Sequence, residues 1–265
     1  MSNHDNENLV QRVGLIGGSG FGSAFDSELS SSSSVTEVST RFGDVRATIS
    51  AISQDREIVF IPRHGMRHSV PPHRINHRAN ISALSELGVT HILATSAVGS
   101  LRREIDRGAM VVLDDFVDMR GDITTFFDDL GHVRHTDFSE PFDEDLRLMV
   151  LEEAVKLSTV WLRPPIVYPG GTYLCLNGPR YETPAEIKLF ASWGLDVVGM
   201  TVAPEAILAR ELDIAYCNVA VVTNLGTGLS AAALAHSEVE EEMIQSRPFL
   251  LAVLIKSLRR LLGAV

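Results

Sequence analysis

The sequence predicts a single α/β domain in which helices cover both faces of a β-sheet. Three observations support this prediction. Short apolar runs alternate along the chain with longer stretches of helical periodicity. The 265 residues, of which 45% are hydrophobic, are enough for one large core. Neither an internal repeat nor a linker-like segment divides the chain, so we expect one domain over residues 13–265, preceded by a flexible N-terminus at residues 1–12.

The strands are predicted from apolar runs that each end in glycine, serine, asparagine or a charged residue. In chain order these runs are VGLIGG, IVFIPR, HILATSAVG, MVVLDDFVD, GTYLCL, DVVGM and AYCNVAVVTN. A further strand is expected around Thr36 to Thr40, following a serine run at Ser30 to Ser34 that is typical of a surface loop.

The helices are predicted from stretches in which apolar residues recur every three or four positions. They lie near Ala79 to Leu87, Glu144 to Leu157, Pro184 to Ser192, Pro204 to Glu211 and Ser237 to Leu262. The third helix has the clearest start, because Thr183 is a good N-cap, Pro184 suits the first helical position and Glu186 completes a capping box.

Composition and charge exclude several classes of function. The net charge of −11 repels nucleic acid and anionic membrane surfaces, and no segment is long and apolar enough to cross a membrane. The polar start MSNHDNENLVQR lacks a signal-peptide core, and two cysteines, Cys175 and Cys217, argue against a disulfide framework, so we expect a cytoplasmic protein. An anionic substrate would have to be bound by local cations and backbone amides.

Ligands of α/β proteins bind where strands give way to polar residues. The first such place is VGLIGGSGF, in which Gly17, Gly18, Ser19 and Gly20 allow the backbone to turn its amides toward an anion. The spacing GGSG is not the GxGxxG of dinucleotide-binding proteins, and a serine-rich segment follows in place of a helix. We therefore reject a Rossmann interpretation.

The second place is FIPRHGMRH, which brings Arg63, His64, Arg67 and His68 together in an acidic protein. A guanidinium presents a planar fork that matches phosphate oxygens, and imidazole adds another donor. The alternative is that these side chains form structural ion pairs. A metal site is disfavoured because the histidines lack a nearby carboxylate or thiolate and the segment does not fit HExxH.

Two more strands are predicted to end in small or polar residues, in ATSAVGS and VVGMTVAPE. The first would leave the hydroxyls of Thr95 and Ser96 and open backbone amides at the edge of the sheet. The second would place Met200 beside Thr201 ahead of a helix, although a methionine here also suits a hydrophobic core. In NGPRYETPAE, helix capping accounts for the threonine and proline but leaves Tyr181 and Glu182 unexplained.

Five motifs in this order, LIGGSG, PRHG, SAVGSLR, GPRYETPAE and VGMTVAPE, resemble the nucleoside phosphorylases that include methylthioadenosine phosphorylases and trimeric purine nucleoside phosphorylases. The resemblance covers residues 13–260 and implies a single α/β domain with a mixed, partly barrel-like sheet flanked by helices. It implies a pentosyltransferase that replaces the purine at ribose C1′ with inorganic phosphate and needs no metal or organic cofactor. The implied partners are a purine nucleoside, phosphate and further copies of the chain, as a homotrimer or a dimer of trimers.

The resemblance also implies roles for individual residues. Phosphate would lie among Ser19, Arg63, His64, Ser96, the Ala97 amide and Thr201. Ribose would lie against Met200 and His236, and His135 in HVRHTDFSEPF would come from a neighbouring subunit. The purine would stack on Tyr181 and meet Glu182 and Asn224. The catalytic residues would be Asn224, Glu182 and His64. Groups hydrogen-bonded to N7 and O6 would take up the charge that builds up on the leaving base, as an oxyanion hole does.

Three positions predict 6-oxopurines, inosine and guanosine, as the substrates. Glu182 stands where methylthioadenosine phosphorylases have a small hydroxyl residue, and a carboxylate accepts from the N1–H that adenine lacks. Asn224 stands where adenine-specific relatives show TDxD, and its amide can donate to O6 and accept from N7, although asparagine also simply ends strands. His236 stands where methylthio-specific relatives have valine and would bond the 5′-hydroxyl, unless it is a solvent-exposed residue at a helix start.

Other functions stay open. An S-methyl-5′-thioinosine phosphorylase would keep Glu182 and Asn224 but require an apolar pocket for the 5′ substituent. An S-methyl-5′-thioadenosine phosphorylase would contradict all three specificity positions, although PRHGMRHSVPPHRINHRANI resembles that branch. A nucleoside-binding protein without turnover would leave the phosphate-binding set idle, and a requirement for phosphate would distinguish the enzyme from the binder.

Overall fold

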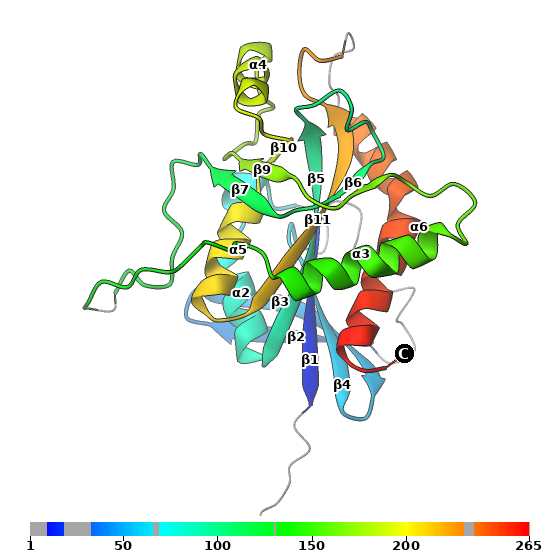
Figure 1. Ribbon diagram of the computed structural model, residues 1–265. Coiled ribbons are helices and arrows are strands. Elements are labelled where there is room, and N and C mark those ends of the chain that lie inside the picture. The colour runs from blue at the N-terminus through cyan, green and yellow to red at the C-terminus, as the bar shows by residue number, and fades with distance from the viewer. Residues whose placement is uncertain (1–9, 19–32, 66–68, 130, 231–235, 265) are drawn as a thin grey trace, which may run out of the picture.

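The computed structural model describes residues 10–18, 33–65, 69–129, 131–230 and 236–264, which form a mixed α/β fold around one sheet (Figure 1). In this part of the chain the strands are β1 (Gln11–Gly17), β2 (Ser33–Thr40), β3 (Gly43–Ser53), β4 (Arg56–Pro62), β5 (Val89–Ser100), β6 (Met110–Val112), β7 (Asp115–Asp118), β8 (Val167–Tyr168), β9 (Thr172–Cys175), β10 (Val197–Gly199) and β11 (Ala215–Leu225). The helices are η1 (Pro72–Arg74), α2 (His77–Glu86), α3 (Glu144–Ser158), α4 (Pro184–Ser192), α5 (Val202–Glu211) and α6 (His236–Leu261). The predicted fold class, a single-domain α/β fold with a mixed sheet between helices, is confirmed.

The centre of the sheet is a block of four parallel strands. β1 pairs in parallel with β4 on one side and with β5 on the other, and β5 pairs in parallel with β11. Their carboxyl ends therefore meet along one edge of the sheet. On this edge β5 also pairs with β10, which is antiparallel to it and leads into α5. This edge thus brings together the ends of β1, β4, β10 and β11 and the last third of β5, as expected for a ligand-binding edge.

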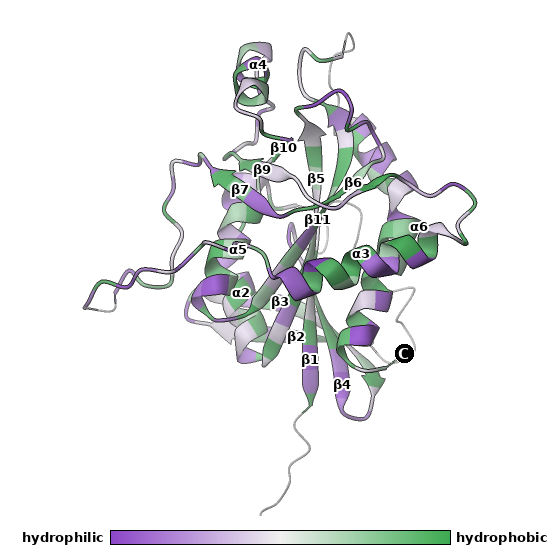
Figure 2. Cartoon of the chain, viewed as in Figure 1, coloured by the Kyte–Doolittle hydropathy of each residue, from purple (hydrophilic) through white to green (hydrophobic). Residues whose placement is uncertain are grey.

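Helices cover both faces of the sheet. Figure 1 shows α2 and α5 on one face and α3 and α6 on the other. One hydrophobic cluster joins residues of α2 and α5 to the sheet, and a second joins residues of α3 and α6 to the opposite face. Both hydrophilic and hydrophobic stretches occur along α3 and α6 (Figure 2), as expected for helices with one face on a core. None of the described helices is both long and apolar enough to span a bilayer.

Several predicted boundaries differ from the structure. β1 begins at Gln11, inside the segment expected to be a flexible N-terminus, and residues 1–9 lie outside the described residues. Ser33 and Ser34 belong to β2, where a loop was expected, and the rest of the serine run is not described. The predicted strand MVVLDDFVD is divided into β6 and β7, because β6 pairs with β11 and β8 whereas β7 pairs with β9.

Two strands were not predicted at all. β3 alternates buried and exposed residues and contains alanine, serine and threonine, so its hydrophobic signal is weak. β8 is only two residues long. The helices were predicted more closely, and α4 has the bounds that its capping box indicates, with both reciprocal hydrogen bonds between Thr183 and Glu186 present.

Candidate active site

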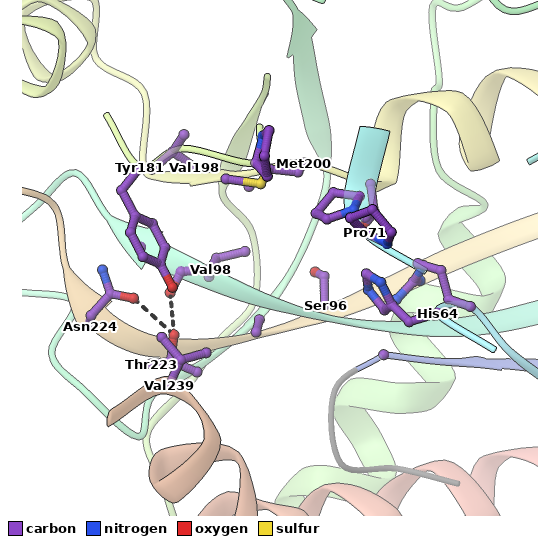
Figure 3. A pocket seen from close by; sticks show the side chains of 18 of the residues that line it. His64, Pro71, Ser96, Val98, Tyr181, Val198, Met200, Thr223, Asn224 and Val239 are labelled. Carbon is purple, nitrogen blue, oxygen red and sulfur yellow. Dashed lines mark hydrogen bonds between the residues drawn. The ribbon is translucent and has the colours of Figure 1, made fainter. Parts of the chain in front are cut away.

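A cavity of about 380 Å³ opens at the carboxyl edge of the parallel strands. It is lined by Gly18, Arg63, His64, Ser69, Val70, Pro71, Pro72, Ser96, Ala97, Val98, Gly99, Pro179, Tyr181, Glu182, Val198, Gly199, Met200, Thr201, Thr223, Asn224 and Val239. Its volume suits a small molecule the size of a nucleoside. Figure 3 shows side chains from β5, β11 and the segments after β4 and β9 converging on the same space.

Nine of the residues predicted for the site line this cavity. Arg63, His64, Ser96, Ala97 and Thr201 come from the set predicted for phosphate, Tyr181, Glu182 and Asn224 from the set predicted for the base, and Met200 from the set predicted for ribose. Ser96 and Ala97 were expected at the end of a strand, but they lie inside β5, which continues to Ser100. The sequence motifs therefore predicted a true cluster, although they are distributed from residue 63 to residue 224.

Arg63 forms the ion pair that was considered as its alternative role. Its Nε and Nη2 donate to the two carboxylate oxygens of Glu205 at 2.5 and 2.8 Å, and its Nη1 donates to the carbonyl of Thr95 at 2.7 Å. Arg63 is 3% exposed and Glu205 is fully buried. Burial alone would raise the pKa of Glu205, but the charge and hydrogen bonds of Arg63 outweigh it and lower that pKa to about 2. Arg63 thus lines the cavity as half of a buried pair and not as an isolated cation.

His64 and Thr201 also line the cavity. Nδ1 of His64 donates to the carbonyl oxygen of Val70 at 2.8 Å, which fixes the hydrogen on that nitrogen and leaves Nε2 as an acceptor when the ring is neutral. Thr201 immediately precedes α5, and its hydroxyl makes no capping hydrogen bond among the residues that the structure describes. One of the predicted donors around an anion, His64, would therefore donate from Nε2 only as a protonated ring.

The turn NGPRYETPAE brings Tyr181 and Glu182 into the cavity. Gly178 has a φ of +64°, which strains any other residue, and a Cβ there would lie 2.3 Å from the sulfur of Met200 and displace that side chain. Glu182 is 8% exposed, and burial raises the pKa of its carboxyl group above the usual 4.5. Tyr181 is 36% exposed, and Figure 3 shows its ring extending toward Asn224 and Val98.

Asn224 lies opposite this turn, near the end of β11, and is 8% exposed. Its Oδ1 accepts from the hydroxyl of Thr223 at 3.0 Å, and its Nδ2 donates to the carbonyl of Leu225 at 3.1 Å. An amide group has two hydrogens and two lone pairs, so one donor and one acceptor stay available for a ligand. A Cβ on Gly99 would lie 3.1 Å from Nδ2, so a larger residue at position 99 would crowd the Asn224 amide.

Sequence reasoning missed the apolar walls of the cavity. These are Pro71 and Pro72 at the start of η1, Val98 on β5, Val198 on β10 and Val239 in the first turn of α6. Isolated valines and prolines carry no chemical signal in a sequence, although Val98 and Val198 do lie inside two of the motifs. The buried partner Glu205 was also missed, because a glutamate near the start of a helix is ordinarily explained by the helix dipole.

The remaining predicted site residues are Ser19, His236 and His135. Ser19 lies outside the described residues, as do Arg67 and His68 of the predicted cationic cluster. His236 is the first residue of α6, one turn before Val239, which does line the cavity. His135 is exposed in the segment between β7 and α3, which extends away from the body of the domain (Figure 1), and does not line this cavity.

Among the residues that the structure describes, the site has no group of metal-binding side chains. No cluster of three or more histidine, cysteine, aspartate or glutamate residues occurs within the described ranges. Both cysteines, Cys175 and Cys217, are buried free thiols whose pKa burial raises to about 12. The chemistry that the cavity offers is therefore hydrogen bonding and charge from its polar side chains.

Comparison with known proteins matches the chain to one family. The family model described as Phosphorylase superfamily matches residues 12–259. A 6-oxopurine nucleoside phosphorylase of Pyrococcus furiosus is 44% identical over 241 residues, covering 88% of this chain and 87% of that protein. A probable 6-oxopurine nucleoside phosphorylase of Dictyoglomus turgidum is 43% identical over 256 residues, covering 96% and 90%. The solved structure of a methylthioadenosine phosphorylase from Schistosoma mansoni in complex with adenine matches with a TM-score of 0.87 and 35% identity, covering 96% of this chain and 92% of that one.

Proposed function

The chain belongs to the phosphorylase superfamily and is a nucleoside phosphorylase, and we propose that it cleaves the 6-oxopurine ribonucleosides inosine and guanosine with inorganic phosphate. The products are the free base and ribose 1-phosphate. As a pentosyltransferase the enzyme moves the ribosyl group from the purine to phosphate, a reaction of purine salvage. The observation that carries the choice of substrate is that Glu182 and Asn224 line one cavity.

Recognition of the base follows from these two side chains. A purine stacked on Tyr181 presents its N1–H to the Glu182 carboxylate, which also accepts from the 2-amino group of guanosine. The remaining N–H of Asn224 donates to O6, and its remaining lone pair accepts from protonated N7. Adenine lacks the N1–H and would place a lone pair against the carboxylate, so the same arrangement rejects 6-aminopurines.

Catalysis stabilises charge on both sides of the breaking bond. Ribose becomes oxocarbenium-like as the C1′–N9 bond lengthens, and negative charge moves onto the base, where the N–H of Asn224 donates to O6 while Glu182 holds the base in place through N1–H. A preorganised hydrogen bond of this kind is worth about 3 kcal/mol in the transition state. Phosphate is the nucleophile and is held by Ser19, Arg63, His64, Ser96, the Ala97 amide and Thr201. No general base is needed, because phosphate already carries the attacking anionic oxygen.

The ribose site is completed by Met200, His236 and a neighbouring subunit. Met200 lies beside the sugar, and His236, at the start of α6, bonds the 5′-hydroxyl. His135 serves the site of the next copy of the chain in a homotrimer. The exposure of His135 on a segment that extends away from its own domain supports this arrangement.

A second candidate is an S-methyl-5′-thioinosine phosphorylase, which would use the same base-binding residues. The specific observation in its favour is the apolar wall of the cavity, where Pro71, Pro72 and Val239 would suit a thiomethyl group better than a hydroxyl. Cleavage of S-methyl-5′-thioadenosine is less favoured, because it would leave the Glu182 carboxylate facing the adenine N1 lone pair.

The reaction proceeds with phosphate as a co-substrate and without a metal or organic cofactor. The two buried free thiols fit a reducing compartment, and we place the enzyme in the cytoplasm. Dialysis against a chelator should leave the rate unchanged. A rate that falls and returns with added divalent metal would contradict this part of the proposal.

The substrate is tested with five nucleosides: inosine, guanosine, adenosine, S-methyl-5′-thioadenosine and S-methyl-5′-thioinosine. Each is incubated with and without phosphate, and base release is followed by chromatography. We expect phosphate-dependent cleavage of the 6-oxopurines, with inosine ahead of S-methyl-5′-thioinosine, and little cleavage of the 6-aminopurines. Cleavage without phosphate would identify a hydrolase instead.

A further inference from the structure

A chain of buried hydrogen bonds leads from the Arg63–Glu205 pair to Ser96 in the cavity. Tyr216 donates its hydroxyl hydrogen to Oε2 of Glu205 at 2.8 Å, and Nδ2 of Asn218 donates to the Tyr216 oxygen at 3.3 Å. The hydroxyl of Ser96 donates to Oδ1 of Asn218 at 2.8 Å. All five residues are at most 3% exposed, so water does not compete for these bonds.

The direction of every bond in this chain is set by the charge of Glu205. An ionised carboxylate has no hydrogen to give, so Tyr216 must donate to it, and burial raises the pKa of that phenol well above its usual 10, which keeps its hydrogen in place. The Tyr216 oxygen then accepts from the NH₂ group of Asn218. Consequently the carbonyl of Asn218 faces Ser96.

Ser96 is thereby committed as a donor inside the protein. A serine hydroxyl has one hydrogen and two lone pairs, and its hydrogen is used by Asn218. Ser96 lines the cavity (Figure 3), and toward the cavity it presents only lone pairs. Turning the hydroxyl toward a ligand would leave the buried carbonyl of Asn218 without a partner, which is costly.

We propose that Ser96 acts as a hydrogen-bond acceptor for the anion bound in this cavity, with Tyr216 and Asn218 as positioning residues, so that the site selects an oxyanion that still carries a hydroxyl group. This inference rests on the proposed function for the identity of the anion, inorganic phosphate. At neutral pH phosphate keeps at least one P–OH group, whereas sulfate keeps none. The P–OH donates to Ser96, and the deprotonated oxygens are left for the ribose.

The Arg63–Glu205 pair leaves this selection to Ser96. The two opposite charges lie within 3 Å of each other, so together they bring no net charge to this wall of the cavity. Sulfate and hydrogen phosphate carry the same double negative charge, so the pair does not distinguish them, and sulfate gains nothing extra there to offset the lone pairs of Ser96. Phosphate avoids that repulsion by donating.

The test compares phosphate and sulfate binding to the full chain without nucleoside, by isothermal titration calorimetry. For the wild type we expect phosphate to bind at least about tenfold more tightly than sulfate, as one hydrogen bond to a charged group allows. In Ser96→Ala phosphate should weaken about tenfold or more while sulfate keeps or gains affinity. If Ser96 is a donor instead, Ser96→Ala weakens both anions by the same factor, and the proposal is wrong.

The positioning residues are tested with Tyr216→Phe. Without the phenolic oxygen, the Asn218 amide can turn its NH₂ to Ser96, which frees the serine hydrogen for an anion. Sulfate should then bind more tightly and the preference for phosphate should shrink several-fold, a change that a general loss of structure would not produce. Tyr168→Phe is the matched control, since its hydroxyl donates to the Glu104 carbonyl on the exposed surface.

The two proposals can fail separately. A wild-type preference for phosphate that Tyr216→Phe leaves unchanged would overturn the role of the buried chain. If the phosphate and sulfate affinities change as expected but the protein cleaves no nucleoside, the proposed function is contradicted and this inference stands. If the enzyme cleaves inosine with phosphate and sulfate competes as if it bound equally tightly, the proposed function stands and this inference is contradicted.

Discussion

Replacing Glu182 with glutamine changes the charge of the base-binding carboxyl group and almost nothing else. Glutamine keeps the shape of the side chain, but one of the two acceptor oxygens becomes an NH₂ donor. Inosine, which presents N1–H alone, can still donate to the remaining oxygen. Guanosine presents N1–H and a 2-amino group, so one of its donors would face the new NH₂.

The size of the effect follows from the burial of this residue. Glu182 is 8% exposed, so water cannot replace a lost bond. A hydrogen bond to a charged group contributes about 1.5–3 kcal/mol, which corresponds to about 10-fold to 150-fold in kcat/KM. We expect inosine to lose up to about that factor, because its bond is weakened, and guanosine to lose more, because a donor is also left unpaired.

The assay is steady-state phosphorolysis of inosine and guanosine at saturating phosphate. The matched control is Glu152→Gln, which neutralises an exposed carboxylate on α3 that does not line the cavity and should leave both substrates unchanged. An equal loss for inosine and guanosine, or no loss for either, would refute the reasoning that Glu182 reads the base.

Other predictions concern stability, pH and the ribose end. Glu205→Gln should lower the free energy of unfolding by about 3–5 kcal/mol, because it leaves Arg63 as a buried unpaired charge. With a pKa of about 2 in the fold against the usual 4.5, this contribution is complete above pH 4.5 and is lost as pH falls toward 2, so urea unfolding of the two proteins should converge there. Because burial raises the pKa of Glu182, kcat/KM for inosine should fall on the acid side at a pH above 4.5, and Glu182→Gln should remove that limb of the profile. His236→Val should reverse the preference of inosine over S-methyl-5′-thioinosine, and an unchanged order of kcat/KM would separate His236 from the 5′ position. Mixing inactive His135→Ala with inactive Glu182→Ala should restore activity through subunit exchange, and no recovery after proven exchange would argue against a shared site.

Local signals explain why parts of the fold were predictable. The capping box at Thr183 and Glu186 requires only four consecutive residues, so the start of α4 could be read from the sequence. α5 begins at Val202, two residues before its predicted start at Pro204, because proline is tolerated anywhere in the first turn, where no intrahelical N–H bond is needed. Strand β3 depends on pairing with β2 and β4, which no local pattern encodes.

The candidate site shows the same limit at the level of side chains. The motifs indicated that Arg63 and Ser96 would lie in one cavity, because strand ends of a parallel sheet meet. They did not reveal that Glu205 would hold Arg63, or that Asn218 would take the hydrogen of Ser96. These partners are 142 and 122 residues away along the chain, so their effect on charge and hydrogen-bond direction is a property of the folded protein alone.

A competition between two nucleosides tests the central claim most directly. Equal concentrations of inosine and S-methyl-5′-thioadenosine are mixed with the enzyme and phosphate in one vessel, and the released bases are measured at early times, which gives the ratio of the two kcat/KM values. We predict that hypoxanthine is released first, that adenine release is slower by at least about a hundredfold, and that neither base is released without phosphate. Adenine appearing first would contradict the assignment of Glu182 and Asn224 as readers of a 6-oxopurine.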